Sequence, residues 1–251
     1  MPDTRHALVT GGWRGIGRAI AEALAGEGMR LTLVGRDAKR LQSAANDMKA
    51  VAVVADVADP KAIEHAHAEA VAKNGPVDVL VNNAGIVETA LLHKTSLDMW
   101  ERLLRVNLTG AFLWCKAVVP AMVERRWGRI VNVGSTTSQR GYAYVAAYAA
   151  SKHGLLGLTR SLAMEVVKAG VTVNAVCPGY TDTDIVTEAV KAIVAKTGKD
   201  QGFAEASLNQ YNPQRRLIQP QEVAATVLWL VRAGSESVTG QAISLSGGEI
   251  M

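Results

Sequence analysis

The sequence predicts an α/β fold, a doubly wound parallel sheet of seven strands with helices on both faces. Short runs of aliphatic and β-branched residues alternate with longer segments whose apolar residues recur at helical spacing, which is typical of parallel sheets. Several short runs are almost continuously hydrophobic, as expected for strands that helices cover on both faces. The chain has 251 residues and no low-complexity linker or internal repeat. We therefore expect a single domain over residues 1–251.

Each element is predicted in order from these patterns. The strands are expected at 6–10, 30–35, 51–55, 77–82, 128–134, 171–177 and 242–246. The main helices are expected at 16–27, 38–48, 60–73, 97–123, 148–168 and 220–232. The least regular part is 179–219, and connections of this length in a compact domain usually carry lids or binding loops. Its segment "IVTEAVKAIVAKTG" has apolar residues at helical spacing, so we expect a substrate lid at about 185–216.

Composition and charge narrow the classes of function. The formal net charge is only +4 and the basic residues are scattered, which disfavours a nucleic-acid-binding surface. Cys115 and Cys177 form no CxxC motif, a pattern that suits a reducing cytoplasm. The N-terminal "MPDTRHALVT" is too polar for a signal peptide, and no apolar run is expected to reach the length of a membrane span. His65 and His67 face different directions on a predicted helix, and no metal site is expected. We expect a cytoplasmic protein without a membrane or nucleic-acid partner.

The stretch "LVTGGWRGIGRAI" (8–20) reads as a strand, a glycine-rich turn and an amphipathic helix. Gly11, Gly15 and Gly17 have the spacing GxxxGxG, a variant of the dinucleotide-binding pattern. Glycines allow the tight turn and let backbone N–H groups approach a pyrophosphate at the N-terminus of the helix. The sequence therefore predicts a nucleotide-binding loop at this position.

The end of the second predicted strand bears on the choice of nucleotide. In "LVGRDAKR", Gly35 stands where many NAD-binding sheets have an acid that holds the adenosine ribose, and Arg36 follows it. Arg14 lies within the glycine loop. Two guanidinium groups near the ribose favour a 2′-phosphate, so NADP(H) is the preferred cofactor and NAD(H) is possible. The alternative is that Asp37 binds the ribose and Arg36 is an ordinary surface residue.

Tyr148 and Lys152 lie four residues apart in the alanine-rich segment "YAASK" and so share one face of a predicted helix. Tyr142 and Tyr144 do not stand in this relation to Lys152. An isolated pair of this kind could be a packing tyrosine beside a solvated lysine. Reduction of a carbonyl needs a proton donor, and an ammonium about 4 Å away contributes about 4 kcal/mol at an effective dielectric of 20. We expect Lys152 to lower the pKa of Tyr148 towards neutrality.

The motifs together resemble those of the short-chain dehydrogenase/reductase family. They are "TGGWRGIG", "NNAG" (82–85), "RVNLTG", "NVGS" (132–135), "YAASK" and "PGYTDTD" (178–184), in the family's order and at its spacing over residues 6–248. The chain looks most like bacterial reductases of 3-oxoacyl thioesters and polyketides. The resemblance implies a Rossmann-type fold, a homotetramer, and NADP(H)-dependent interconversion of a ketone and a secondary alcohol. The first expected substrate is a 3-oxoacyl thioester of CoA or of acyl carrier protein.

The resemblance also implies roles for individual residues. Tyr148 corresponds to the proton donor, Lys152 to its partner, Ser135 to the substrate-orienting serine and Asn107 to the residue that holds a relay water. The implied cofactor contacts are Gly11, Trp13, Arg14, Gly15, Ile16, Gly17, Arg36, Asp56, Val57, Asn83, Gly85, Tyr148, Lys152, Pro178, Gly179, Thr181 and Thr183. Ser246 replaces the usual Asp of a C-terminal "DGG", a departure that concerns C-terminal or subunit contacts rather than chemistry.

Two other functions stay open at this point. One is a general secondary-alcohol dehydrogenase for cyclic, aromatic or polyketide ketones. The other is a non-catalytic nucleotide-binding regulator, which would be expected to have lost Ser135, Tyr148 or Lys152. Basic residues of the lid region could attract the phosphates of a pantetheine-linked substrate, or they could be a solvated helix face. These residues are Lys191, Lys196, Lys199, Arg215 and Arg216.

Overall fold

The computed structural model, which describes residues 4–251, contains a seven-stranded sheet in the order β3-β2-β1-β4-β5-β6-β7. All six neighbouring pairs run parallel, as predicted. The strands are β1 (His6–Thr10), β2 (Arg30–Gly35), β3 (Val51–Val54), β4 (Val79–Asn82), β5 (Gly128–Val133), β6 (Val171–Pro178) and β7 (Ala242–Leu245). The chain starts at the centre, builds outward to β3, and then crosses to β4, so its direction of winding reverses between β1 and β4. The first three residues of the predicted domain and N-terminus lie outside the described residues.

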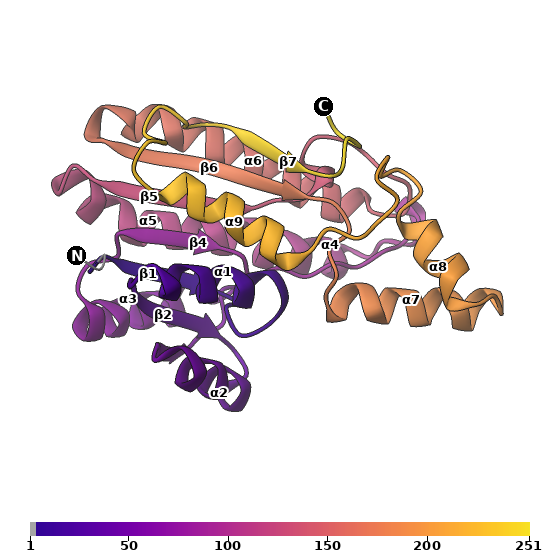
Figure 1. Ribbon diagram of the computed structural model, residues 1–251, viewed down its shortest axis with the longest axis horizontal. Helices are drawn as coiled ribbons and strands as arrows, with labels where there is room; N and C mark the ends of the chain where they lie inside the picture. Colours follow the sequence, from indigo (N-terminus) through magenta and orange to yellow (C-terminus); the bar gives the residue numbers. More distant parts are fainter. Residues whose placement is uncertain (1–3) are drawn as a thin grey trace.

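Helices cover both faces of the sheet (Figure 1). The helices are α1 (Gly15–Gly26), α2 (Ala38–Met48), α3 (Pro60–Asn74), α4 (Leu97–Leu104), α5 (Gly110–Glu124), α6 (Ala146–Val166), α7 (Asp184–Thr197), α8 (Gln201–Leu208) and α9 (Pro220–Val231). Successive side chains of a strand point to opposite faces. In β1, Ala7 and Val9 therefore pack with α1, α2 and α9, whereas Leu8 packs with α3, α5 and α6. This explains why the strand is hydrophobic without alternation.

The predicted helix 97–123 is interrupted in the structure. A π-helical turn, Arg105–Thr109, separates α4 from α5 and carries the buried Asn107. Such turns are frequent at functional sites, because the extra residue displaces a side chain from its regular position. Gly110 follows directly, where a Cβ would lie 2.7 Å from the carbonyl oxygen of Val57. The close approach to Val57 thus requires glycine at the start of α5.

The same helical stretch corrects the prediction about membrane-length segments. Leu97–Glu124 spans 28 residues with a mean hydropathy of 1.4 in its most apolar window, so by length and composition alone it could cross a membrane. In the structure, Leu103, Trp114 and Met122 of this stretch are fully buried. Trp114 and Met122 belong to the core on one face of the sheet, whereas Leu97 and Phe112 of the same stretch are exposed.

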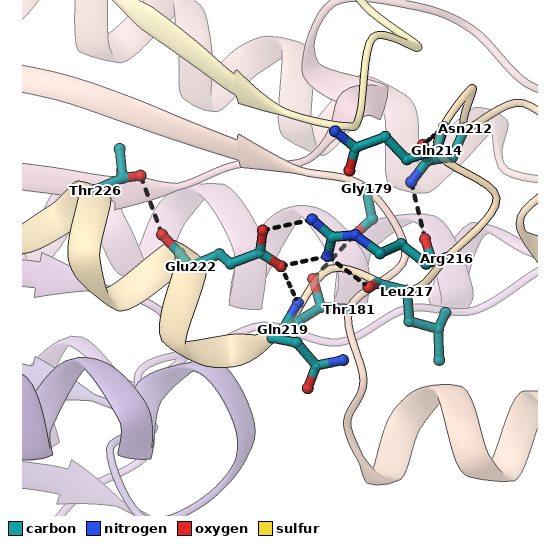
Figure 2. Close-up of polar contacts among 9 residues, drawn as sticks. All are labelled: Gly179, Thr181, Asn212, Gln214, Arg216, Leu217, Gln219, Glu222 and Thr226. Atoms are coloured by element: carbon teal, nitrogen blue, oxygen red, sulfur yellow. Dashed lines mark hydrogen bonds and ion pairs between the residues drawn. The ribbon is translucent and has the colours of Figure 1, made fainter.

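The predicted lid region forms α7 and α8, which project beyond the carboxyl ends of the strands (Figure 1). Val186 and Val190 pack against Ala204 in a small apolar cluster of their own. The chain then returns to α9 through a segment held by Arg216, whose two terminal nitrogens donate to the carboxylate of Glu222 at 2.6 and 2.8 Å (Figure 2). Glu222 also accepts from the backbone N–H of Gln219 at 2.7 Å, so the return segment is fastened to the first turn of α9.

Candidate active site

A cleft of about 740 Å³ opens at the carboxyl ends of the strands, where the winding reverses between β1 and β4. In open α/β sheets this is the place where ligands bind. All of the predicted cofactor contacts line this cleft, as do Ser135, Tyr148 and Lys152. Asn107 does not line it. It lies behind Lys152, on a separate cavity of about 10 Å³.

The glycine loop is shaped to hold a nucleotide. Gly11 has a φ of +65°, and a Cβ there would lie 2.9 Å from Nδ2 of Asn83. A Cβ on Gly17 would lie 2.3 Å from the carbonyl oxygen of Gly11, so α1 can approach the loop only with glycine at this position. Arg14 precedes α1 without a side-chain cap for the helix. The N-terminal amides therefore point towards the cleft and suit an anion such as a pyrophosphate.

Trp13 fills the corner at the end of β2. A Cβ at Gly35 would lie 3.2 Å from Cδ1 of Trp13 and 3.3 Å from Cδ1 of Leu41. The guanidinium of Arg14 stacks over the Trp13 ring at 4.7 Å and that of Arg40 at 5.4 Å. The sequence did not reveal where Trp13 points, and the structure shows that its ring lies close beside position 35, where it would crowd a side chain.

Arg14 and Arg36 both line the cleft near this corner. Arg36 Nη1 lies 3.7 Å from Oδ2 of Asp56, and Arg14 Nη1 lies 4.0 Å from Oδ2 of Asp184. Both arginines remain largely solvated, so these pairs are weak. Asp37, the alternative ribose ligand, caps α2 by accepting from the backbone N–H of Arg40 at 3.0 Å. The two guanidinium groups are therefore the more available partners for an anionic ribose substituent.

α6 places Tyr148 and Lys152 one turn apart, as predicted. Lys152 is buried, and its Nζ donates to the carbonyl oxygen of Val133 at 2.8 Å. That Nζ lies 5.7 Å from the centre of the Tyr148 ring. The helix carries small residues on this face, Ala149 and Ser151 among them, which lets it pack closely against the end of β5.

The expectation that Lys152 brings the pKa of Tyr148 towards neutrality is wrong for the polypeptide itself. Burial raises the pKa of Tyr148 to about 12, although hydrogen bonding to Ser135 lowers it in part. Burial also lowers the pKa of Lys152 to about 8. The cause is desolvation, which penalises the charged form of both groups, and Lys152 directs its ammonium at a backbone carbonyl. Tyr148 is thus held protonated at neutral pH.

Ser135 follows β5 and starts the short 3₁₀ turn Thr136–Ser138. Its hydroxyl accepts from the backbone N–H of Thr137 at 3.2 Å, and its own N–H donates to the hydroxyl of Ser138 at 3.1 Å. This reciprocal cap fixes the side chain at the mouth of the cleft, beside Tyr148.

Asn107 connects to the same group of residues from behind. Its Oδ1 accepts from the backbone N–H of Ile86 at 2.8 Å, and its Nδ2 donates to the hydroxyl of Ser151 at 3.1 Å. That hydroxyl donates to the carbonyl oxygen of Tyr148 at 2.7 Å. A Cβ on Gly85 would lie 3.3 Å from Asn107 Oδ1 and 3.7 Å from Lys152 Nζ, so glycine allows the two side chains to converge.

Of the two interpretations of the basic lid residues, the structure favours the solvated helix face. None of the five basic lid residues lines the cleft. Lys191 donates to Glu188 at 2.8 Å, Arg216 is paired with Glu222, and Lys199 lies over the ring of Phe203 at 4.1 Å. The cleft wall formed by α7 is apolar instead, with Ile185, Val186, Ala189, Ala192 and Ile193.

Sequence reasoning missed two residues at the end of the cleft that faces the lid. Tyr142, set aside because of its spacing from Lys152, lines the cleft and donates its hydroxyl hydrogen to Glu249. Glu249 also lines the cleft, in the turn that follows β7. No local pattern marks either residue, because they are 107 positions apart in the chain.

Comparison with known proteins identifies the family. Residues 5–193 match the family described as short chain dehydrogenase. The chain belongs to the short-chain dehydrogenase family. It is 40% identical over 252 residues to the acetoacetyl-CoA reductase of Shinella zoogloeoides, with 98% of each protein covered. It is 38% identical over 252 residues to a 3-oxoacyl-[acyl-carrier-protein] reductase of Synechocystis sp., covering 98% of this chain and 96% of that relative.

A solved structure of the actinorhodin polyketide ketoreductase with NADPH is also similar, with a TM-score of 0.94 and 36% identity over 99% of this chain and 98% of that one. This short-chain dehydrogenase is accordingly an oxidoreductase with a nicotinamide cofactor and a small-molecule substrate. The glycine loop and the end of β2 described above fit such a cofactor. The expected homotetramer and cytoplasmic location stay predictions.

Proposed function

We propose that this short-chain dehydrogenase is an NADPH-dependent ketoreductase that converts the ketone of a 3-oxoacyl thioester into a secondary alcohol. The observation that carries the proposal is that Ser135, Tyr148 and Lys152 line the same cleft as the glycine loop, which is suited to bind a nucleotide. The relatives named acetoacetyl-CoA reductase and 3-oxoacyl-[acyl-carrier-protein] reductase support the substrate class. Retention of all three side chains weighs against a non-catalytic regulator.

The proposed chemistry places one proton and one hydride. When bound, the reduced nicotinamide supplies the hydride for the carbonyl carbon. Ser135 donates a hydrogen bond to the carbonyl oxygen, and Tyr148 transfers its hydroxyl proton to that oxygen as negative charge develops on it. The raised pKa of Tyr148 keeps this proton in place at neutral pH. Reprotonation of Tyr148 requires a nearby exchangeable group.

Lys152 is the exchangeable group near Tyr148, and Asn107 positions the backbone beside it. With a pKa lowered to about 8 by burial, Lys152 can release and regain a proton near neutral pH. Asn107 orders the backbone of Ile86 immediately behind Lys152. We assign Lys152 to the supply of the proton and Asn107 to the positioning of the path by which it is replaced.

The preference for NADPH rests on Arg14 and Arg36. Their guanidinium groups lie near the corner at the end of β2, where Gly35 carries no acidic ribose ligand and Trp13 makes a side chain at position 35 tight. A 2′-phosphate at this corner would receive charge-assisted hydrogen bonds from one or both arginines. The solved ketoreductase with NADPH supports the same preference.

The substrate half of the cleft suits an acyl chain, because the α7 wall is aliphatic. The same wall would accept an uncharged cyclic or aromatic ketone. This second candidate is favoured by one observation, that Lys191 and Arg216 are paired with carboxylates and lie outside the cleft.

The two candidates are separated by substrate kinetics. Oxidation of NADPH is followed with acetoacetyl-CoA, with the N-acetylcysteamine thioester of the same acid, and with cyclohexanone, and Tyr148→Phe serves as the control for catalysis. The proposal expects both thioesters to have at least about tenfold higher kcat/KM than the cyclic ketone, a difference of about 1.4 kcal/mol in activation free energy. Reduction of the cyclic ketone alone would instead establish the second candidate.

A further inference from the structure

The end of the cleft beneath the lid holds a carboxylate, Glu249. It belongs to the turn that follows β7, and this turn is tightly built. The backbone N–H of Glu249 donates to the carbonyl oxygen of Ser246 at 3.2 Å, and the hydroxyl of Ser246 accepts from the N–H of Ile250 at 3.1 Å. Ser246, the departure from the family pattern, thus closes the turn that carries Glu249 to the cleft.

Two glycines in this turn allow it to lie against the return segment of the lid. Gly247 has a φ of +61°, and a Cβ there would lie 2.0 Å from Oδ1 of Asn212. Gly248 has a φ of +94°, and a Cβ would lie 3.4 Å from Cγ of Pro213. A side chain at position 247 would clash with Asn212, and at position 248 the positive φ itself favours glycine, so both residues support the turn that places Glu249.

Among residues 4–251, only one oxygen of the Glu249 carboxylate accepts a hydrogen bond from the protein. Oε1 accepts the hydroxyl hydrogen of Tyr142. Oε2 lies 3.6 Å from the position that a Cβ on Gly179 would take, beside the end of β6. Within residues 4–251, no hydrogen-bond donor of the protein reaches Oε2. An acceptor therefore faces the cleft next to Gly179, a residue predicted to contact the cofactor.

Tyr142 is held so that it continues to donate to Glu249. Its ring lies 5.9 Å from that of Tyr211, and the guanidinium of Arg140 lies over both rings at 5.3 and 5.4 Å. Burial and the hydrogen bond to Glu249 raise the pKa of Tyr142 to about 12, so the hydroxyl stays protonated. The loop after Ser135, the return segment of the lid and the turn after β7 thus meet at this carboxylate.

We propose that Glu249 selects the substrate: it binds ketones that carry a hydroxyl or other hydrogen-bond donor near the carbonyl and rejects those that carry a carboxylate there. This inference rests on the proposed ketoreductase function. Glu249 is half-buried, and a carboxylate in a cleft that keeps one oxygen unpaired gains from a donor and loses from a like charge. The basic residues of the lid do not line the cleft, and Arg140, the cation near Tyr142, stacks on the two tyrosine rings and does not line the cleft either.

The test uses three methyl ketones that differ only in the terminal group: pentan-2-one, 4-hydroxybutan-2-one and 4-oxopentanoate. In the native protein with NADPH, we expect kcat/KM to be highest for the hydroxyl compound and at least about 30-fold lower for the carboxylate than for the methyl compound, the effect of a like charge at close range. In Glu249→Gln, the penalty on the carboxylate should shrink by about tenfold, while the methyl compound changes less than about twofold.

Two further variants make the test specific. Glu188→Gln removes one negative charge from an exposed ion pair of α7 and should leave all three ratios unchanged. Glu249→Asp keeps the charge but withdraws it from Tyr142, so it should retain the rejection of the carboxylate and lose the preference for the hydroxyl. If Glu249→Gln does not fold, Glu249→Asp still tests the preference for the hydroxyl compound, and an unchanged preference in that variant would contradict the proposal.

Binding separates this inference from the proposed function. Dissociation constants of the three ketones are measured by calorimetry with Tyr148→Phe in the presence of NADPH, with and without Glu249→Gln. If the native protein oxidises no NADPH but the binding order depends on Glu249, the ketoreductase proposal fails and the selection by Glu249 stands. The selection by Glu249 is overturned if turnover is normal but Glu249→Gln leaves the order of the three dissociation constants unchanged. It is also overturned if none of the ketones binds.

Discussion

Trp13 packs against Gly35, with its Cδ1 atom only 3.2 Å from where a Cβ at position 35 would lie. The two residues belong to different strand ends, and Arg14 and Arg40 stack on the indole. The contact crowds any side chain at the place where an NAD-binding sheet commonly carries an acid, so an acid there would require Trp13 to shift. Cofactor choice in this protein therefore involves the space available at the corner as well as the charge of Arg36.

The first prediction concerns this corner. Gly35→Asp should lower kcat/KM for NADPH by about 10- to 100-fold, because it places a carboxylate near the 2′-phosphate and strains the contact with Trp13. It should not create efficient use of NADH by itself. The double change Gly35→Asp with Trp13→Ala should raise kcat/KM for NADH by about tenfold over the single change.

Side-by-side kinetics with both cofactors check the result, and Trp13→Ala alone is the control. A native protein that already prefers NADH would contradict the assignment of Arg14 and Arg36. Equal use of NADH by the single and the double variant would contradict the steric role of Trp13.

The second prediction concerns the proton donor. Tyr148→Phe keeps the ring and removes the hydroxyl, so turnover should fall by about 10²- to 10⁴-fold while the dissociation constant of NADPH changes little. Tyr142→Phe, on the wall of the same cleft, should retain most of the turnover with a neutral ketone. Stopped-flow oxidation of NADPH and titration of cofactor fluorescence give the two quantities. Near-native turnover in Tyr148→Phe would refute the assignment.

The third prediction concerns the buried lysine. Because burial lowers the folded-state pKa of Lys152 from 10.5 to about 8, the unfolded chain binds more protons between these two values. The charged lysine therefore destabilises the protein below about pH 8, and this penalty is relieved as the pH rises from 8 to 10.5. Lys152→Met should raise the free energy of unfolding at pH 7, by at most roughly 3 kcal/mol, and by much less at pH 10.5.

Urea unfolding of nucleotide-free protein at both pH values measures this difference. Lys39→Met, which removes an exposed lysine, is the matched control and should show no such pH dependence. Equal effects of Lys152→Met at pH 7 and pH 10.5 would show that the ammonium is not destabilised by burial.

The fourth prediction concerns the anchor of the lid. The hydrogen bonds from Arg216, together with the N–H of Gln219, hold the pKa of Glu222 down to about 2. The stabilisation from this lowered pKa is fully present above the ordinary carboxyl pKa near 4.3 and is lost progressively as the pH falls from there through about 2. Glu222→Gln should therefore speed amide exchange in residues 209–219 by a similar factor at pH 7 and pH 5, and should raise KM more than it lowers kcat.

Hydrogen exchange followed by mass spectrometry resolves this segment. Glu188→Gln breaks an exposed pair on α7 and should leave exchange in 209–219 unchanged. Unchanged exchange in Glu222→Gln would mean that the pair seen in Figure 2 does not restrain the return segment.

The sequence by itself determined the order of strands and helices, the glycine loop after β1 and the pairing of Tyr148 with Lys152. These features depend on local periodicity and on spacings of a few residues, which are visible in the sequence without knowledge of the fold. The prediction of one helix over 97–123 missed the π-helical turn at Asn107, because that turn is held by contacts to Ile86 and Ser151 from other elements.

Only the tertiary structure decided the electrostatics of the site and the wall beneath the lid. The spacing of Tyr148 and Lys152 suggested mutual attraction, but burial of both groups dominates their pKa values in the polypeptide. The sequence left open whether the basic residues of the lid face the substrate or solvent; in the structure none of them lines the cleft, and Lys191 and Arg216 are paired with carboxylates. Glu249 reaches Tyr142 across 107 positions of sequence, and a contact of that range depends on the packing of three separate segments rather than on any pattern along the chain.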